Sequence, residues 1–398
     1  QSFRCLCSVM LVVGAALPSW AEQVFSYGEA DALFDTAQER DGHLSFGALG
    51  RLSERYFDAK DRVHQQNGSY WFFEDRLINQ WGDGSRINDN ELNLIARQEF
   101  ARAHAGGWSL NLWGQFANSL GGKTGGEFQS DLGILSPLNG GNSGPDKSNE
   151  ILQMAALEYV APEGAWRAQA GKLSLRMLVN LNRYANGDSE MFFSPMLGNN
   201  PVVPYTALLG LGAYGQYQTE AWSLAGLVRA PDTELGLTLD GWEAGNRGYV
   251  VEAALTPDLP GLGEGIYRLT WSLDEANDAL PRMETWSLST DQDFGPRLGG
   301  FFRYAWAETT FRDFDQRLAA GFQVKKPLGL THDRLGLGYW WGHPSDATLD
   351  PEQGLEIFYK AQISRFLEIT PDIQLVKDPA FSTRDSDVVL GLRLRLFF

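Results

Sequence analysis

The chain ends in residues 387–398, DVVLGLRLRLFF, and this stretch decides the fold class. Apolar residues alternate with other residues along it, which in a β-strand separates two faces. The opposite face carries Arg393 and Arg395, so we expect hydrocarbon on one side and water on the other. Twelve residues at about 3.3 Å each, tilted by roughly 45°, span an apolar band of about 25 Å. The apolar face consists of Val388, Leu390, Leu392, Leu394, Leu396 and Phe398.

The composition describes a folded, acidic chain. Its 398 residues include 33 Lys and Arg against 50 Asp and Glu, for a formal net charge of −17, and 12% are aromatic. Disordered acidic chains contain few aromatic residues, so we expect a folded protein. Nucleic-acid binding needs a basic patch, so the acidic balance argues against a nucleic-acid partner. The length alone favours two or three domains, but large β-barrels depart from that rule.

The N-terminal stretch has the features of a secretory signal peptide. Arg4 supplies a positive charge, residues 9–17 form an apolar run, and small residues around Ala21 predict cleavage after it. Both cysteines, Cys5 and Cys7, lie inside this segment, so we expect no disulfide in the mature protein. No later stretch approaches 18 uninterrupted apolar residues. A periplasmic protein, a secreted protein and an outer-membrane barrel remain as options.

Alternation with period two dominates the chain from about residue 90 onward. Sixteen stretches fit β-strands with one apolar and one polar face. Residues 69–79 (SYWFFEDRLIN) could form a seventeenth, but we assign them to a loop, because bacterial single-chain barrels have even strand numbers. The sixteen predicted strands are residues 43–54, 90–104, 107–119, 150–160, 165–175, 206–219, 221–230, 247–256, 265–274, 282–291, 297–308, 315–326, 333–343, 353–364, 366–377 and 386–398.

Short and long connections alternate between these strands. Short turns at one rim and long loops at the other are typical of an outer-membrane barrel, whose short side is periplasmic. A soluble β-sandwich has no reason to show this alternation. The short links are 104–107, 160–165, 219–221, 291–297 and 364–367, and the long links are 54–90, 119–150, 175–206, 230–247 and 343–353.

We therefore predict an all-β fold, a 16-stranded antiparallel transmembrane β-barrel with long extracellular loops. Residues 120–149 are rich in Gly, Ser and Asn, whereas residues 176–205 mix aromatic residues with Asn, Arg and Pro. Loops of about 30 residues are uncommon unless they are functional or disordered, so we expect one or two to fold into the lumen. We assign residues 1–21 to the signal peptide, 22–42 to an N-terminal periplasmic segment and 43–398 to the barrel.

The sequence offers no motif for catalysis, a cofactor or a metal ion. Residues 117–124 (ANSLGGKT) lack the first glycine of a phosphate-binding loop. The five histidines show no ligand spacing, and no serine lies in a G-x-S-x-G motif. We expect neither an enzyme nor a cofactor. An active site assembled on the barrel from distant residues stays an alternative.

The polar faces of the strands supply candidate lumen residues, because sixteen strands enclose a lumen wide enough for water. Neighbouring Arg and Glu side chains offer donors and acceptors to hydroxyl-rich solutes, and an indole offers a flat face to a pyranose ring. A phosphate pore would instead need a ladder of Arg and Lys. The alternative for each residue is that it only solvates the wall or pairs with a neighbour. The candidates are Arg97, Glu99, Glu158, Glu252, Arg303, Trp340, Lys360 and Gln362.

Several stretches resemble the carbohydrate-selective outer-membrane porins of the OprB type. The resemblance is clearest in KKPLGLTHDRLGLGYWW (325–341), PDIQLVKDP (371–379) and the closing strand. Residues 166–175 and 182–205 match in character, whereas residues 26–42 depart from the opening of the family. The resemblance implies a sixteen-stranded barrel for passive diffusion of monosaccharides such as glucose, with a constriction lined by Arg, Glu and aromatic residues.

The resemblance also implies roles for three further residues. Lys172 matches the Gly-Lys pair before the constricting loop, and Arg183 and Tyr184 fall within the matching loop. We therefore expect a porin in the cell outer membrane of a Gram-negative bacterium, surrounded by lipid and conducting small sugars. A homotrimer is one option for its assembly. The alternatives are a general or small-acid diffusion porin, favoured by a constriction of one charge sign, and a barrel enzyme or adhesin, favoured by a catalytic constellation or a plugged lumen.

Overall fold

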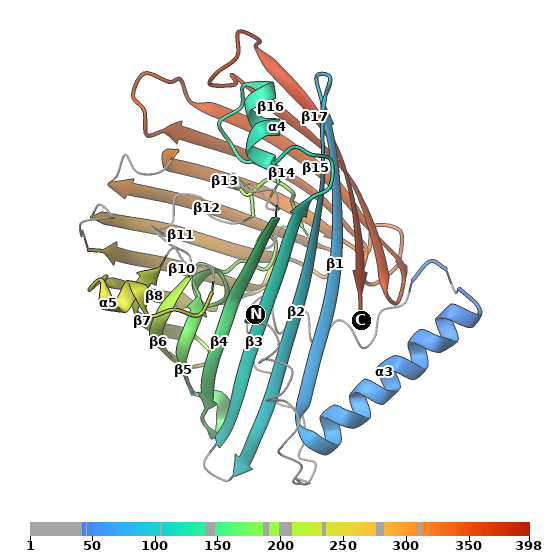
Figure 1. The fold of residues 1–398 in the computed structure, drawn as a ribbon, viewed down its shortest axis with the longest axis vertical. Helices are drawn as coiled ribbons and strands as arrows, with labels where there is room; N and C mark the ends of the chain where they lie inside the picture. The colour runs from blue at the N-terminus through green and yellow to red at the C-terminus, as the bar shows by residue number, and fades with distance from the viewer. Residues whose placement is uncertain are drawn as a thin grey trace.

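A computed structural model describes residues 42–44, 46–103, 106–139, 148–185, 191–198, 209–232, 236–275, 282–308 and 313–398. Within these ranges the strands form one closed antiparallel barrel (Figure 1). The predicted signal peptide, residues 1–21, lies outside the described residues, as do residues 22–41 of the predicted periplasmic segment.

Sixteen strands make up the barrel wall, and the two-residue strand β9 (Asp258–Leu259) pairs only with the start of β10. Each wall strand pairs with its neighbours along the chain, in antiparallel fashion. The prediction of a 16-stranded antiparallel barrel is confirmed. The wall strands are β1 (Ser69–Gly82), β2 (Ser85–Ala103), β3 (Gly106–Ser119), β4 (Ser148–Val160), β5 (Trp166–Ser174), β6 (Leu209–Gln218), β7 (Trp222–Asp232), β8 (Gly248–Leu255), β10 (Gly263–Asp274), β11 (Met283–Phe294), β12 (Leu298–Glu308), β13 (Phe314–Lys325), β14 (Arg334–Pro344), β15 (Glu352–Ser364), β16 (Leu367–Lys377) and β17 (Ser386–Phe397).

The first and last strands close the barrel. β1 pairs with β17 in a register that runs from Glu74 opposite Phe397 to Trp81 opposite Leu390. Beyond the last strand residue, Phe73 and Phe398 exchange backbone hydrogen bonds of 2.8 Å in both directions. Closure satisfies the backbone groups that a sheet edge would leave unpaired, which is the condition for strands in hydrocarbon.

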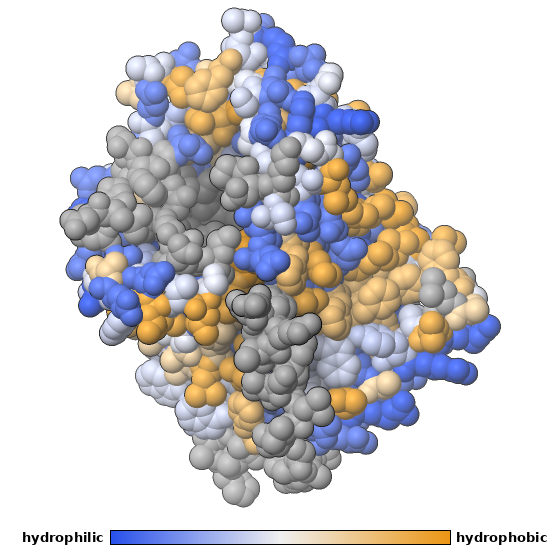
Figure 2. Space-filling model, viewed as in Figure 1, coloured by the Kyte–Doolittle hydropathy of each residue, from blue (hydrophilic) through white to orange (hydrophobic). Residues whose placement is uncertain are grey.

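Each strand presents an apolar face outward and a mainly polar face inward, as the alternation predicts. In β17, Val388 and Leu390 are about half exposed on the outside, whereas Arg393 and Arg395 are each 1% exposed and point into the barrel. In Figure 2, hydrophobic residues form a broad region across the middle of the visible wall, with hydrophilic residues above it. Other outward apolar side chains are Trp286, Leu288, Phe302, Tyr304, Trp306, Leu337, Tyr339, Leu355, Ile357, Ile373 and Leu375.

The connections differ in length between the two rims. At the end of the barrel where the C-terminus lies, connections such as 219–221, 295–297 and 365–366 are short. We refer to this end as the periplasmic rim. At the opposite rim the connections 120–147 and 175–208 are long. They contain α4 (Gly125–Leu132) and the 3-10 turn η3 (Leu175–Met177); η2 (Pro162–Gly164) lies in a periplasmic turn, and α5 (Asp240–Glu243) precedes β8.

The prediction for residues 43–54 is wrong, because most of them belong to a helix, α3 (Ala48–Asn67). Residues 69–79, which we had assigned to a loop, lie in β1. Leu49, Leu52, Tyr56 and Val63 recur at spacings of three, four and seven, which favours a helix over a strand. The barrel wall therefore begins at Ser69 rather than at residue 43.

A turn signal at residues 83–84 identifies the true first hairpin. Asp83 and Gly84 have φ angles of 34° and 78°, the left-handed region that a type I′ turn requires and that Asp-Gly favours. Ser85 pairs directly with Gly82 across this turn. The predicted long link 54–90 is therefore wrong, because β1 and β2 are joined by two residues at the rim that carries the long loops.

The helix α3 lies outside the wall, beside the C-terminus at the periplasmic rim (Figure 1). It ends at Gly68, whose left-handed φ of 65° allows its N–H to bond the carbonyl of His64. At the other rim, α4 begins with a capping box between Thr124 and Glu127. Within the described part of the chain, none of the helices combines the length and the apolar character needed to cross a membrane.

Candidate functional site

A long connection after β5 folds against the inward faces of the wall strands. We call its described parts, residues 175–185 and 191–198, the lumen segment. Phe192 is fully buried, and its ring lies 5.5 Å from that of Phe301 and 4.9 Å from that of Phe358, both inward-facing. Phe193, Met196 and Leu197 are buried in the same way. Burial of these large apolar side chains explains why the connection folds inward rather than extending into water.

The first part of the lumen segment is bonded to β8 and β11. The Asn180 N–H donates to the carboxylate of Glu252 at 2.5 Å, and the Ser287 hydroxyl donates to the Asn180 side chain at 3.0 Å. Two residues further, the Asn182 amide donates to Ser289 at 3.2 Å. Asn180 has a φ of 56°, a left-handed conformation that asparagine tolerates better than most residues.

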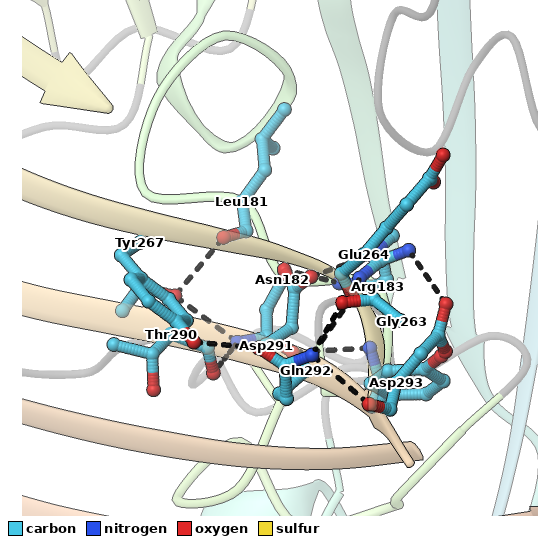
Figure 3. Close-up of polar contacts among 12 residues, drawn as sticks. Leu181, Asn182, Arg183, Gly263, Glu264, Tyr267, Thr290, Asp291, Gln292 and Asp293 are labelled. Atoms are coloured by element: carbon cyan, nitrogen blue, oxygen red, sulfur yellow. Dashed lines mark hydrogen bonds and ion pairs between the residues drawn. The ribbon is translucent and has the colours of Figure 1, made fainter. Parts of the chain in front are cut away.

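Arg183 and Tyr184 then meet a carboxylate cluster near the periplasmic end of β11 (Figure 3). The Arg183 guanidinium lies 2.5 Å from Asp291 and 3.3 Å from Asp293. The Tyr184 hydroxyl donates to Asp293, which also accepts from Lys325 at 2.6 Å. Burial, and then the hydrogen bond to Asp293, raise the pKa of the Tyr184 hydroxyl, so it stays a donor at neutral pH.

The same cluster extends to β10. Arg268 donates to Asp291 at 3.1 Å and to the carbonyl of Leu181 at 3.0 Å. Arg183 reaches the backbone carbonyl of Glu264 at 2.9 Å (Figure 3). The Arg183 side chain is still 31% exposed, and Asp293 is 19% exposed. The cluster is therefore held rigidly but keeps donors and acceptors open to solvent.

Arg303 on β12 lies between the barrel wall and the lumen segment and bonds the backbone of the segment. It is 2% exposed, and its guanidinium donates to the carbonyls of Asn180 (2.6 Å), Ala185 and Gly198. Arg317, on the neighbouring β13, donates to the carbonyl of Leu197 at 3.3 Å. Arg303 points inward as predicted, but it lies beneath the lumen segment and bonds its backbone.

The far part of the lumen segment is fixed to β15 and β17. The Glu356 carboxylate accepts from the N–H groups of Phe193 (2.5 Å) and Ser194 (3.0 Å). Arg393 donates to the carbonyl of Met191 at 2.9 Å, and its guanidinium lies 4.5 Å from the Phe193 ring centre. The lumen segment is thus bonded to opposite parts of the wall, from β8 and β11 on one side to β15 and β17 on the other.

Inward-facing glycines make room for the lumen segment. A Cβ at Gly338 would lie 2.8 Å from Leu197, and one at Gly391 would lie 2.9 Å from Phe193. A Cβ at Gly299 would overlap the Tyr184 ring. Gly338 belongs to the Asp-Arg-Leu-Gly-Leu-Gly stretch (333–338) that resembles the OprB-type porins. The space that Leu197 needs gives a physical reason for a glycine at this position of the motif.

The connection between β3 and β4 adds a second layer. The N–H groups of Leu135 and Ser136 both donate to Glu352 at 2.8 Å. The carbonyl of Leu138 accepts from Gln374 at 2.9 Å. Ser194 of the lumen segment donates to the Pro137 carbonyl at 3.0 Å, so the two connections meet inside the barrel.

Arg97 and Glu158, predicted from different strands, lie in one cluster on the wall. Glu158 is 1% exposed and pairs with Arg167 at 2.8 Å, while Arg97 lies at 3.9 Å from it. Arg97 also donates to Asn111 at 2.8 Å. Glu99 lies at the periplasmic end of β2, where its N–H bonds the carbonyl of Gly68.

Lys360 lies in a row of alternating charges across the closing strands. It is 3.6 Å from Glu368, which pairs with Arg395 at 2.8 Å. Arg395 in turn bonds Glu74 on β1. All of these side chains are nearly completely buried, so they pair with one another along the wall.

The remaining predicted residues are dispersed. Gln362 is fully buried and donates to the carbonyl of Ser364 at 2.6 Å. Trp340 is 2% exposed and packs over Gly354. Lys172 on β5 donates to the carbonyl of Gly236. These three side chains do not join the cluster around Arg183.

Sequence reasoning named Glu252, which holds the lumen segment at Asn180, but missed the other carboxylates that hold it. Asp291 and Asp293 alternate on the polar face of β11, directly after Ser287 and Ser289, so two acids on one face were the available signal. Glu356 was visible on the polar face of β15, but its bonds to the lumen segment are with backbone N–H groups, which carry no sequence signal. Among the described residues, no three His, Cys, Asp or Glu side chains are grouped so that they could hold a metal ion.

Comparisons with known proteins agree with this arrangement. A family model described as "Carbohydrate-selective porin, OprB family" matches residues 124–398. The high-pH structure of Pseudomonas putida OprB superposes with a TM-score of 0.71 at 14% identity, covering 90% of this chain and 99% of that one. Its low-pH structure gives a TM-score of 0.54 at 14% identity, covering 90% and 100%.

A mutant of Rh. blastica porin is similar at a TM-score of 0.53 and 11% identity, covering 83% of this chain and 100% of that one. A search of curated proteins found no match. The structural likenesses support the barrel fold, and the family match spans more than half of the 398 residues. The chain therefore belongs to the carbohydrate-selective porins of the OprB family and is a bacterial outer-membrane porin for the diffusion of sugars.

Proposed function

We propose that this porin conducts monosaccharides such as glucose passively, through a path narrowed by the lumen segment. The observation that carries the proposal is the attachment of this segment to opposite parts of the wall. Glu252 and Asp291 bond it on one side, and Glu356 bonds it on the other. A segment held in this way restricts the cross-section to small solutes.

Weak hydrogen bonding to hydroxyl groups is the proposed basis of sugar preference. Arg183 and Lys325 are 31% and 23% exposed and offer donors, while Asp293 offers an acceptor beside them. The whole cluster holds three cations, Arg183, Arg268 and Lys325, and two carboxylates, Asp291 and Asp293. Most of its charge is therefore offset, and a neutral polyol meets only a weak net field. Binding must stay weak for the solute to leave as readily as it enters.

The proposal includes the location of the channel, its lipid surroundings and its assembly. The protein acts as a channel without catalysis, in the cell outer membrane of a Gram-negative bacterium. Lipid surrounds the outward apolar band, which includes Leu337, Ile357 and Leu390. In a homotrimer part of this band would be covered, and native mass spectrometry of the detergent-solubilised protein would then show three copies.

Liposome swelling tests sugar selectivity. Protein in phospholipid vesicles is exposed to glucose, to a size-matched neutral non-sugar, to a disaccharide and to a small organic acid. We expect glucose to enter faster than the non-sugar and the disaccharide. Equal rates for glucose and the size-matched non-sugar would remove the sugar preference, and a faster acid would favour a small-acid porin.

A substitution connects the preference to the site. Arg183→Gln is expected to lower the glucose rate more than the non-sugar rate, because it removes a charged donor from the cluster. The matched control is Arg282→Gln, which removes an exposed Arg that pairs with Glu284 and Glu308 at the opposite end of β11. If both variants change the glucose rate equally, the Arg183 cluster is not the sugar-contacting part of the path.

A further inference from the structure

The helix α3 packs against the periplasmic rim through one narrow face. Ser53, Phe57 and Lys60 are 6%, 0% and 2% exposed and recur at spacings of four and three. Phe57 lies under the Arg365 guanidinium at 4.5 Å, and the Lys60 ammonium lies 5.2 Å from the Tyr70 ring centre. This face supplies the fully buried contacts of α3 with the barrel.

A second, apolar stripe on α3 is only partly covered by protein, with one exposed and three half-buried side chains. Leu52, Tyr56, Ala59 and Val63 follow one another at spacings of four, three and four, which places them on one side of a helix. At 3.6 residues per turn this stripe lies about 100° around the helix from the attached face. Leu52 is 63% exposed, although water is an unfavourable neighbour for it.

The apolar stripe points to the same side as the outer face of the barrel. Tyr56, in the middle of the stripe, accepts a hydrogen bond of 2.9 Å from the indole N–H of Trp71. Trp71 and Phe73 alternate with the inward residues Tyr70 and Phe72, so they face outward. Tyr56 also contacts the ring of Phe398 at 6.1 Å. The stripe therefore continues the outward apolar band of β1 and β17.

The rest of α3 is suited to water. Five of its other exposed side chains carry charges of both signs, Arg51, Glu54, Arg55, Asp58 and Arg62, and the exposed Gln65, Gln66 and Asn67 are polar. In Figure 2 the flank of α3 that faces away from the barrel is mostly hydrophilic. Just before α3, Phe46 is 39% exposed and packs against Phe366 of the β15–β16 turn at 5.9 Å.

We propose that α3 lies along the surface of the periplasmic phospholipid leaflet, with Leu52, Tyr56 and Val63 among the headgroups and upper acyl chains. An amphipathic helix with an apolar stripe and a charged flank adopts this position, buried about 5–10 Å into the interface. Trp71 supports the depth, because indoles favour the headgroup level of a membrane. The inference rests on the outer-membrane placement of the barrel and extends it to a helix outside the wall.

Site-directed spin labelling tests the proposal in phospholipid vesicles. The full chain, with Cys5→Ser and Cys7→Ser, receives one cysteine at a time through Leu52→Cys, Glu54→Cys or Leu390→Cys. Glu54 is the matched control on the opposite side of α3, and Leu390 is the reference on the outer face of β17, 49% exposed. Each nitroxide is measured for its accessibility to oxygen, which collects in lipid, and to a water-soluble nickel chelate.

The expected result is a several-fold higher ratio of oxygen to chelate accessibility at Leu52 and Leu390 than at Glu54. A Leu52 label as open to the chelate as the Glu54 label overturns the proposal, because α3 then lies in water. A Leu52 label closed to both reagents also overturns it, because protein then covers the stripe, either a second copy or residues 1–41. If the Leu390 label is open to the chelate, the membrane placement fails and the proposal with it. Heat-modifiable gel mobility confirms that each labelled barrel is folded.

Discussion

Removing the Arg303 guanidinium should free the lumen segment. This side chain donates three hydrogen bonds to backbone carbonyls of the segment, from Asn180, Ala185 and Gly198. A hydrogen bond from a charged donor is worth about 1.5–3 kcal/mol when nothing replaces it. Water in the lumen can solvate part of what Arg303→Ala exposes, so we use about 1 kcal/mol for each bond and about 3 kcal/mol in total. That shifts the equilibrium between the held and the released segment by about 100-fold.

Single-channel recording detects this shift as current noise. We expect Arg303→Ala to show frequent transitions between conductance levels and a higher mean conductance than the wild type, and swelling assays to show faster disaccharide entry. Arg97→Ala is the matched control, because Arg97 also lines the wall and bonds Asn111 of β3. We expect it to leave the noise unchanged.

Two further variants separate anchoring from charge. Arg303→Lys keeps the positive charge but loses the planar fork that reaches three carbonyls, whereas Arg303→Gln loses the charge and keeps one amide donor. If the three carbonyl bonds hold the lumen segment, Arg303→Lys must show more current noise than the wild type. Anchoring by Arg303 is refuted if Arg303→Lys behaves as wild type while Arg303→Gln resembles Arg303→Ala, or if Arg303→Ala is no noisier than Arg97→Ala.

Three other substitutions test separate contacts. Glu356→Gln leaves one carbonyl oxygen for the N–H groups of Phe193 and Ser194. We expect the attachment of the lumen segment to weaken by about 1–3 kcal/mol, with current noise between that of the wild type and that of Arg303→Ala. Noise at the wild-type level would show that Glu356 is not an anchor. Gly338→Val would place its side chain against Leu197 and Phe192. We expect this overpacking to destabilise the barrel by about 1–3 kcal/mol, which lowers the temperature of heat modification. Gly215→Val is the control, because a Cβ at Gly215 has open space, and it should leave that temperature unchanged. Burial lowers the pKa of the Lys60 ammonium from 10.5 to about 8. Between about pH 8 and pH 10.5 the released helix therefore binds more protons than the attached helix. The attachment of α3 should strengthen as the pH rises through this range, by at most about 3 kcal/mol. Lys60→Met should abolish this dependence in urea titrations that follow a spin label at Glu54→Cys, and a pH-dependent midpoint in the variant would contradict the assignment.

The strand pattern was predictable because hydrocarbon outside and water inside impose a period of two on every wall strand. β12, β14, β15, β16 and β17 lie within a few residues of their predicted bounds, and Arg303, Trp340 and Lys360 face inward as expected. The start of the barrel was not predicted. There, residues 43–54 alternate by chance over a few positions, and the helical spacing of α3 becomes clear only over its full length. The Asp83-Gly84 turn carried enough information to correct the assignment.

The site was harder to predict, because its contacts join side chains to backbone atoms far away in the chain. Arg303 was placed on the correct face, but nothing in the sequence relates it to the carbonyl of Asn180, 123 residues earlier. The same holds for Glu356 and Ser194, 162 residues apart. Hydrogen bonds to backbone depend on where the chain passes rather than on residue type, so only the folded barrel reveals them.

The distribution of charge inside the barrel is consistent with a neutral solute. The chain carries a formal charge of −17, yet several of the carboxylates that face inward have cationic partners close by: Glu368 pairs with Arg395, Asp291 with Arg183, and Asp293 with Lys325. Glu352 and Glu356 accept hydrogen bonds from backbone N–H groups instead. A lumen with unpaired acids would attract cations and raise their local concentration. Where these pairs form, they weaken that field while keeping hydrogen-bonding groups along the path. The fixed segment then limits size, and the paired ions limit the response to charge, which leaves hydroxyl contacts as the remaining means of discrimination.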